Sequence, residues 1–402
     1  MKDRQEETPP SSVDGDEIMR GPDDVVYLEE LQFDDDEMLE DQEEEFADWE
    51  RPQDFSVVAF TEHTGSVFCC DLHLNGKIAA TGGEDDKAYV WCVESGQTIM
   101  ECNGHKDSVI FAGFSFDGAY LATVDMSGLI KVWKCQSEES QQDPWPVVFE
   151  YEADELNWAL WHFGARVLIC GASAGDIYVF KIPSGETKVL QGHNIKTECG
   201  KVFPDGVRLA AGYEDGVVKF WDLKTNLVLH QVAAGLHGSR VNAIDVHPDN
   251  NLVASISTNG TVVLTTSNNG KVVGKLEAEN DLETVAFCPD PELGFFALGT
   301  LNGSVTIWDI ARQMMRHQCI KSEDAFTGVT KMIWIKDKLL TGLLDGSVRV
   351  YDGRSGEQCS LITGHWSEVL DMTYNAKENK LLTASDDHTA RIFIYPTISE
   401  DD

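Results

Sequence analysis

A repeat runs from residue 55 to residue 395 and constrains the fold of this chain more than any other feature. Each copy contains a turn pair, then alternating small or polar and apolar residues, then a large residue. The copies are DDKAYVW (85–91), SGLIKVW (127–133), AGDIYVF (174–180), DGVVKFW (215–221), NGTVVLT (259–265), NGSVTIW (302–308), DGSVRVY (345–351) and DHTARIF (387–393). Successive copies lie 41 to 47 residues apart, which is the length of a unit of four short strands.

The sequence between the copies supplies the remaining strands. In the second unit, SVIFAGFS (108–115) alternates and ends at a turn, AYLATV (119–124) follows, and LIKVWK (129–134) comes after another turn. Eight units predict an all-β, eight-bladed propeller over residues 54–395. DFSVVAF (54–60) also alternates, and we expect it to be the outer strand of blade eight. That pairing would close the ring and remove the exposed sheet edges.

Gly-His pairs precede several units, as at Gly104-His105, Gly192-His193 and Gly364-His365. With the terminal tryptophans, they make residues 55–395 resemble the WD40 family of β-propellers. The resemblance implies a hydrogen-bonded tetrad in each blade, formed by a His, a Ser or Thr, an Asp and a Trp. Carried over, it assigns His63, Asp85 and Trp91 in unit one, His193, Asp215 and Trp221 in unit four, and His365, Ser385 and Asp387 in unit eight. No unit supplies all four groups, because Gly83, Tyr213 and Phe393 stand at the missing positions.

Nothing in the sequence indicates catalysis. The ten cysteines form no CxxC pair, and no phosphate-binding loop, dinucleotide-binding glycine pattern or HExxH motif occurs. We therefore expect no enzyme activity, no cofactor and no metal. The N-terminus MKDRQEETPP has no apolar core and no apolar run is long enough to span a membrane. We expect a cytoplasmic protein, with the nucleus as the alternative.

Negative charge dominates both parts of the chain. The net charge is -38, and residues 1–50 carry 21 acidic and 3 basic residues, which leaves -20 for the rest. A segment of like charge cannot form a packed core, so residues 1–53 are predicted to be a disordered tail, and residues 396–402 a short acidic one. A field of this sign repels nucleic acid and anionic lipid but attracts a basic partner. The alternative is that the charge serves solubility alone.

One face of such a ring is a candidate docking surface. In WD40 propellers, two positions flanking the first apolar residue of strand one and the residue before the turn Asp point to the side around the central opening. We assigned these positions in all eight units, with Ser257 as the turn position of unit five. The acidic members are Glu84, Glu155, Glu198, Glu214, Asp281, Glu283, Glu368 and Asp386, and the apolar members chosen as anchors are Phe68, Ile110, Met126, Leu301 and Leu344. Acids around apolar anchors suit a basic amphipathic peptide, although a solvated acidic rim would have the same composition.

The acidic tail, the eight units and the segment GHKDSVIFAGFSFDGAYLATVDMSGLIKVW (104–133) together resemble the angio-associated migratory cell protein family. Fungal members of that family are dedicated chaperones that hold the basic N-terminal segment of ribosomal protein L-ten. The resemblance therefore implies a non-catalytic escort for a basic ribosomal protein. A closed ring has no edge that requires a partner copy, so we expect a monomer. A signalling scaffold in cell migration is the alternative that the family name suggests.

Overall fold

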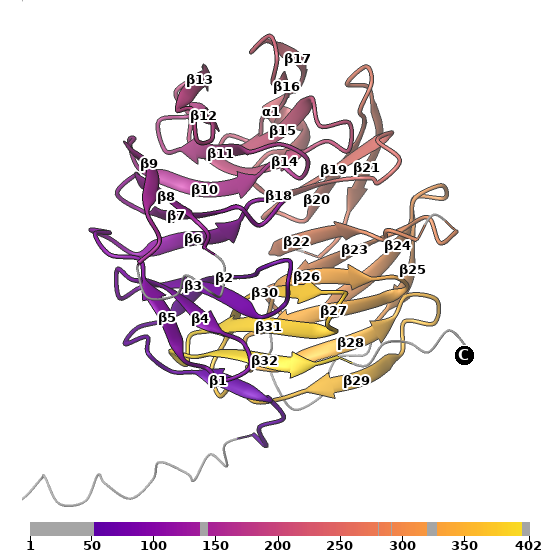
Figure 1. Ribbon diagram of the computed structural model, residues 1–402. Helices are drawn as coiled ribbons and strands as arrows, with labels where there is room; N and C mark the ends of the chain where they lie inside the picture. The colour runs from indigo at the N-terminus through magenta and orange to yellow at the C-terminus, as the bar shows by residue number, and fades with distance from the viewer. Residues whose placement is uncertain (1–51, 137–143, 280, 291, 320–327, 396–402) are drawn as a thin grey trace, which may run out of the picture. The chain divides into compact units, whose positions relative to one another are not determined.

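The computed structural model describes residues 52–136, 144–279, 281–290, 292–319 and 328–395, which form one ring of eight four-stranded sheets (Figure 1). All neighbouring strands pair antiparallel, and they follow chain order in every sheet except the last, where β1 lies beside β32. The first strand of every blade lies beside the first strand of the next, and β2 of blade one lies beside β30 of blade eight. These first strands are therefore the innermost ones and surround the central axis. The two tails predicted from charge lie outside the described residues, apart from 52 and 53.

The first four blades occupy residues 67–232. Blade one contains β2 (Val67–Leu72), β3 (Ile78–Gly83), β4 (Ala88–Cys92) and β5 (Thr98–Glu101). Blade two contains β6 (Val109–Phe114), β7 (Tyr120–Asp125), β8 (Leu129–Lys134) and β9 (Val147–Glu152). Blade three contains β10 (Leu156–Trp161), β11 (Val167–Ala172), β12 (Ile177–Lys181) and β13 (Glu186–Leu190). Blade four contains β14 (Thr197–Val202), β15 (Arg208–Tyr213), β16 (Val218–Asp222) and β17 (Val228–Val232), and a short helix α1 (Ala234–His237) follows it.

The other four blades complete the ring. Blade five contains β18 (Val241–Val246), β19 (Leu252–Ser257), β20 (Thr261–Thr266) and β21 (Val272–Glu277). Blade six contains β22 (Leu282–Phe287), β23 (Phe295–Thr300), β24 (Val305–Asp309) and β25 (Met314–Gln318). Blade seven contains β26 (Val329–Ile335), β27 (Lys338–Leu343), β28 (Val348–Asp352) and β29 (Gln358–Ile362). Blade eight contains β30 (Val369–Asn375), β31 (Lys380–Ser385), β32 (Ala390–Ile394) and β1 (Val58–Phe60).

The core consists of apolar layers between neighbouring blades. Second strands are covered on both faces, and every residue of β3, β7, β19 and β23 is buried. Such strands need continuous small and apolar residues rather than alternation, as IAATGG and LVASIS show. Outer strands are covered on one face at most, so β25 exposes most of its residues. The described residues include no helix that is long and apolar enough to cross a membrane.

The N-terminal strand closes the ring as predicted. Val58 pairs with Ile392 and Phe60 pairs with Ala390, so β1 is the outer strand of blade eight. Phe60 is fully buried and stacks on Trp91 of blade one, with 5.0 Å between the ring centroids and 7° between the planes. One side chain from the start of the ring thereby fills the space between the last and first blades.

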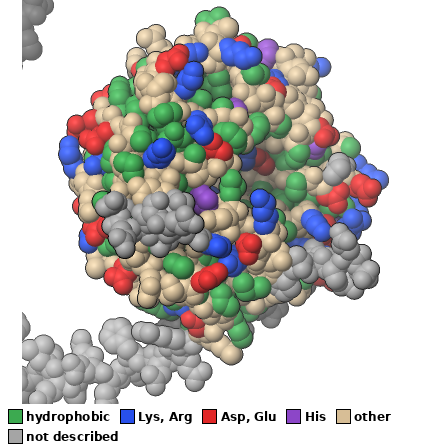
Figure 2. All heavy atoms as spheres, viewed as in Figure 1, with side chains coloured by type: hydrophobic (Ala, Val, Ile, Leu, Met, Phe, Trp, Pro, Cys, Tyr) green, Lys and Arg blue, Asp and Glu red, His purple; other side chains and the backbone are tan. Residues whose placement is uncertain are grey.

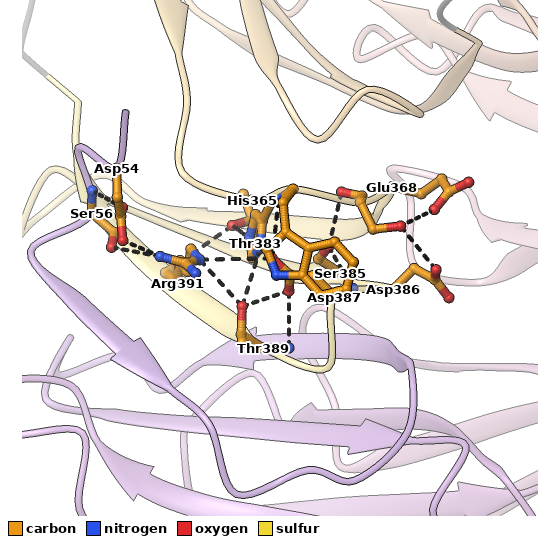
Figure 3. A network of polar contacts seen from close by, with 12 residues as sticks. Asp54, Ser56, His365, Glu368, Thr383, Ser385, Asp386, Asp387, Thr389 and Arg391 are labelled. Atoms are coloured by element: carbon orange, nitrogen blue, oxygen red, sulfur yellow. Dashed lines mark hydrogen bonds and ion pairs between the residues drawn. The ribbon is translucent and has the colours of Figure 1, made fainter. Parts of the chain in front are cut away.

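A clasp of polar groups holds the chain just before β1. The Asp54 carboxylate forms an ion pair with the Arg391 guanidinium (Figure 3). The Phe55 N–H donates to the Thr363 carbonyl oxygen at 3.0 Å. Arg391 also donates to Thr389 Oγ1 at 3.2 Å. These contacts fix the position from which β1 starts.

Blade two contains the complete tetrad, which the sequence interpretation missed. His105 Nδ1 lies 3.0 Å from Asp125 Oδ2, and His105 Nε2 lies 2.8 Å from Thr123 Oγ1. Trp133 Nε1 donates to the same hydroxyl at 3.1 Å. Asp125 is the last residue of β7, at the strand position where Gly83 stands in blade one, rather than in the turn. The expectation that no blade supplies all four groups was therefore wrong.

The sequence interpretation also assigned the tetrad hydroxyl to a residue two positions too far along the chain. In blade eight, His365 Nδ1 lies 2.9 Å from Asp387 and Nε2 lies 2.7 Å from Thr383 Oγ1. Ser385 instead donates to the Ser367 carbonyl oxygen at 3.0 Å, so it is not the tetrad hydroxyl. Residues two apart on a strand share a face, and the sequence alone does not choose between them.

The other assigned tetrad groups follow the same geometry in part. His63 contacts Asp85 at 3.0 Å and Thr81 Oγ1 at 3.0 Å, while Trp91 Nε1 has no hydrogen-bond partner among the described residues. In blade four, His193 Nε2 lies 3.0 Å from Asp215, and Trp221 is buried. Ala211 occupies the hydroxyl position there, 18 residues after His193.

Candidate partner-binding surface

Each blade joins its turn position to the residue before strand one by a backbone hydrogen bond. The turn residue donates its N–H to the carbonyl oxygen of that residue, over 2.8 to 3.4 Å in the eight blades. The turn residues are Glu84, Met126, Ser173, Glu214, Thr258, Leu301, Leu344 and Asp386. The pairs assigned from sequence therefore meet in seven blades, on the face where strand one begins.

Blade five departs from the assignment by one residue. Thr258, and not Ser257, donates to the Arg240 carbonyl oxygen. Ser257 is fully buried and its hydroxyl donates to Asn259 Oδ1 at 2.8 Å. A shift of one residue along a strand turns a side chain to the opposite face, so the Ser257 assignment was wrong.

A β-bulge marks the second residue of every first strand. The register shifts there in all eight blades, so this residue opposes no partner on the second strand. A bulge changes the direction in which its side chain points, and all eight side chains are half-buried. They surround the central axis on the face where strand one begins, which we call the channel mouth. We call these residues the mouth ring: Phe68, Ile110, Asn157, Glu198, Asn242, Glu283, Thr330 and Leu370.

The mouth ring is asymmetric. Leu370, Phe68 and Ile110 belong to the consecutive blades eight, one and two, and they form an apolar arc. The other five members are polar or acidic. Met126, which is 47% exposed, extends the arc on blade two. Leu301 and Leu344, the other predicted anchors, lie on blades six and seven and are outside the arc.

Carboxylates border this apolar arc on blades eight and one. Ser66 Oγ donates to Asp386 Oδ1 at 2.5 Å, and Ser367 Oγ donates to Asp386 Oδ2 at 2.9 Å. Ser367 also contacts Glu368, as Figure 3 shows. Hydrogen bonds from the Ser66 and Ser367 hydroxyls hold the pKa of Asp386 below its usual value against the effect of burial. Asp386 is therefore ionised at neutral pH, and this corner carries negative charge.

Glu84 adds a third carboxylate beside the same corner. Its Oε2 accepts a hydrogen bond from the Ser66 backbone N–H at 3.3 Å. Ser66 thus contacts both Glu84 and Asp386 although 320 residues separate Ser66 from Asp386. The structure therefore brings Glu84 and Asp386 together at the buried Ser66, and Ser367 links Glu368 to Asp386.

The remaining predicted acids are arranged differently. Glu198 pairs with Lys196 at 3.6 Å in its own blade. Glu283 is mostly buried, which raises its pKa, and it accepts a hydrogen bond from Asn242 at 3.3 Å. Glu214, Glu155 and Asp281 are exposed on blades four, three and six. The structure does not gather these five into one group with the corner on blades eight and one.

The sequence interpretation passed over Trp366. This residue follows His365, in the loop before β30, and its side chain is 52% exposed. Its backbone N–H donates to Asp387 Oδ2 at 3.3 Å, which places it close to the acidic corner. An aromatic residue directly after a Gly-His pair was the available signal, since units one, two and four carry Thr64, Lys106 and Asn194 there.

Known proteins similar to this chain agree with the fold. The family described as "WD domain, G-beta repeat" matches residues 55–92, 96–134, 185–222, 233–265 and 356–393. The human angio-associated migratory cell protein is 37% identical over 377 residues, which cover 89% of this chain and 83% of the human protein. The chain belongs to the angio-associated migratory cell protein family. The resemblance seen in the acidic tail and the eight units is thereby confirmed.

More distant relatives of this family member come from fungi. The ribosome assembly protein SQT1 of Saccharomyces cerevisiae is 25% identical over 92% of this chain and 93% of its own. The crystal structure of Chaetomium thermophilum Sqt1 bound to the N-terminus of ribosomal protein L10 superposes with a TM-score of 0.77. It is 23% identical and covers 85% of this chain and all of the solved one. At that identity the likeness shows the fold.

Among the described residues, no group of three or more His, Cys, Asp or Glu side chains is arranged to hold a metal ion. All ten cysteines are free, and most are buried. The groups that the channel mouth presents are the carboxylates, hydroxyls and apolar side chains described above.

Proposed function

We propose that this protein binds a basic protein segment at the channel mouth and escorts a basic ribosomal protein, ribosomal protein L10, before its assembly. The observation that carries the proposal is the acidic corner of Glu84, Glu368 and Asp386 beside the half-buried Phe68 and Leu370. Carboxylates held by hydroxyls next to apolar side chains suit Lys or Arg residues that flank an apolar anchor. The family relationship to the fungal ribosome assembly protein supports the choice of client.

The proposal explains why a carrier of this kind would be acidic. A ribosomal protein outside the ribosome carries unneutralised cations, and these bind RNA without specificity. A carrier that competes through charge binds reversibly and in a salt-dependent manner. We place this activity in the cytoplasm, with no catalytic step.

Charge reversal tests the site. Glu84→Lys, Glu368→Lys and Asp386→Lys together should weaken binding of a fluorescent peptide with the N-terminal sequence of ribosomal protein L10 at least about tenfold, roughly 1.4 kcal/mol. The triple variant should also bind with a weaker salt dependence. The matched control is Glu94→Lys, Glu186→Lys and Glu357→Lys, three exposed acids on the outer hairpins. Equal affinity of the two triple variants would contradict the site.

Purification from gently lysed cells tests the client. A single small basic ribosomal protein, recovered in near-equal amount at low salt and lost at high salt, is the expected result. Recovery of salt-resistant cytoskeletal or membrane regulators instead would favour a signalling scaffold and count against the escort function.

A further inference from the structure

A crevice opens between blades five and six. Its volume is about 310 Å³. The end of β21 lines it together with Trp308 of β24 and Met315 of β25. Trp308 is 9% exposed, and its Nε1 donates to Thr306 Oγ1 at 2.9 Å, so the indole is held in place.

At two of the eight blade junctions an aromatic ring of the outer strand fills this space, whereas Met100 of β5 packs in the cluster of Trp133 at the junction of blades one and two. Between blades two and three, Phe149 and Tyr151 of β9 pack on Phe180, with ring centroids 5.3 and 5.0 Å away. Between blades eight and one, Phe60 of β1 stacks on Trp91. In both cases the outer strand of one blade supplies an aromatic ring to the large third-strand residue of the next.

Blade five supplies no ring at these positions. Tyr151 pairs with Ile130 and Phe149 with Val132, and the same register in blade five places Leu276 opposite Val262 and Gly274 opposite Leu264. Blade five therefore supplies no ring beside Trp308, which stacks on Phe296 of its own blade with 6.2 Å between the ring centroids. An aromatic side chain at this place would repeat the packing at the two junctions described above.

Ser304 provides a second, independent indication of a ligand. It lines the crevice, is only 6% exposed, and its hydroxyl has no hydrogen-bond partner among the described residues. An unsatisfied buried hydroxyl costs about 1–3 kcal/mol, and rotation about one bond lets it meet a polar atom in the crevice.

The rim of the crevice is acidic. Glu277 and Glu279 are exposed, and neither forms an ion pair with any of the described residues. The crevice thus combines an apolar slot, one unsatisfied hydroxyl and two carboxylates without counter-ions.

We propose that the crevice between blades five and six binds a tyrosine side chain of a basic partner segment. The ring lies against Trp308, the phenol hydroxyl meets Ser304, and Lys or Arg residues beside the tyrosine pair with Glu277 and Glu279. The site is separate from the acidic corner on blades eight and one, and it does not depend on the function proposed above.

Binding of short peptides to the full-length protein tests the site. The probes are acetyl-Lys-Tyr-Lys-amide and its Phe and Ala counterparts, and the readout is the indole N–H signal of Trp308 in isotope-labelled protein, assigned with Trp308→Phe. The Tyr peptide should shift this signal saturably, the Phe peptide more weakly, and the Ala peptide not at all. The proposal is overturned if the Tyr peptide does not shift the Trp308 signal, or if all three peptides shift it equally.

Variants of the lining sharpen the test. Ser304→Ala should weaken the Tyr peptide about fivefold and leave the Phe peptide unchanged, because only the phenol loses a partner. Glu277→Gln with Glu279→Gln should weaken all lysine-flanked peptides, and Ala278→Phe should block the crevice. An unchanged Tyr-over-Phe preference in Ser304→Ala would refute the hydroxyl contact even if Ala278→Phe did not fold. The Glu84, Glu368 and Asp386 triple variant should bind the Tyr peptide normally, so the two proposals fail separately.

Discussion

At the scale of single residues, one hydroxyl decides how completely a blade satisfies its buried polar groups. The Thr123 hydroxyl is hydrogen-bonded to both His105 and Trp133, whereas the Thr81 hydroxyl at the same position of blade one is hydrogen-bonded to His63 alone. The sequence could indicate the histidines, because Gly-His pairs stand out at fixed spacing. It could not indicate Asp125, because a strand-end carboxylate replaces the one expected in the turn.

The two threonines provide a matched pair of variants. Thr81→Val keeps the shape and leaves one histidine nitrogen unsatisfied, at a cost of about 1–3 kcal/mol. Thr123→Val leaves a histidine and an indole nitrogen unsatisfied, so it should lower the free energy of unfolding by more than Thr81→Val does. Urea denaturation of both variants measures the difference. Equal losses would mean that the Trp133 hydrogen bond contributes nothing.

His237 makes the stability depend on pH. Its Nδ1 lies 2.9 Å from the Gly216 carbonyl oxygen and its Nε2 lies 2.8 Å from Ser255 Oγ. Burial lowers the pKa of His237 to about 4. The unfolded chain takes up this proton below about pH 6.5, so stability is complete above that pH and falls between pH 6.5 and 4, by up to about 1.4 kcal/mol per pH unit.

His237→Gln should therefore flatten the pH dependence of the unfolding free energy between pH 6.5 and 4. Denaturant unfolding at a series of pH values checks the slope, and His230→Gln, at a half-buried histidine on β17, is the control. A slope that remains unchanged in His237→Gln but changes in His230→Gln would contradict the assignment.

At the scale of elements, β1 is a strand of only three residues that completes a blade. Its effect comes from Phe60, which fills the junction between blades eight and one. The sequence predicted this pairing because alternation and the missing fourth strand of the last unit were both visible. It did not predict the stacking on Trp91, which depends on how two blades pack.

Phe60→Ala should lower the free energy of unfolding by about 3–5 kcal/mol, because it removes a fully buried ring. Val57→Ala, at a neighbouring side chain that is 57% exposed, should change it by less than about 0.5 kcal/mol. Thermal and urea unfolding of the two variants provide the measurement. Similar behaviour of both variants would show that β1 docks without depending on its core residue.

The bulges explain which parts of the candidate surface could be predicted. The mouth ring repeats at a fixed position after each Gly-His or equivalent segment, so most of its members were found from spacing. The mouth ring divides into an apolar arc and a polar arc because ring closure makes blade eight a neighbour of blade one. Leu370 and Ile110 flank Phe68 only because blade eight joins blade one. The acidic corner depends on the same closure, through Ser66 and Asp386.

At the scale of the whole molecule, negative charge is spread over the ring as well as the tail. Figure 2 shows acidic and basic side chains interspersed on the face turned to the viewer, rather than one continuous acidic field. Net charge predicts the sign of a partner but not a place on the ring, so the proposed site rests on local groups such as the acidic corner.

Like charges within one molecule repel one another, and salt screens the repulsion. Raising sodium chloride from about 0.05 to 0.5 M should therefore raise the thermal unfolding midpoint of the free protein. Scanning calorimetry measures it, with sucrose as a non-ionic control for solvent exclusion. A midpoint that falls with salt would show that the ion pairs of the blades outweigh the net repulsion.

The pairing of β1 with β32 has a consequence for synthesis of the chain. Val58 leaves the ribosome early, yet its partner Ile392 is among the last described residues to be made. Until then the first blade keeps one side uncovered and the last sheet has no outer strand, a state that exposes strand edges to other chains. Translation time therefore sets a minimum lifetime for the open form, and slower translation near the end of the message should increase its aggregation.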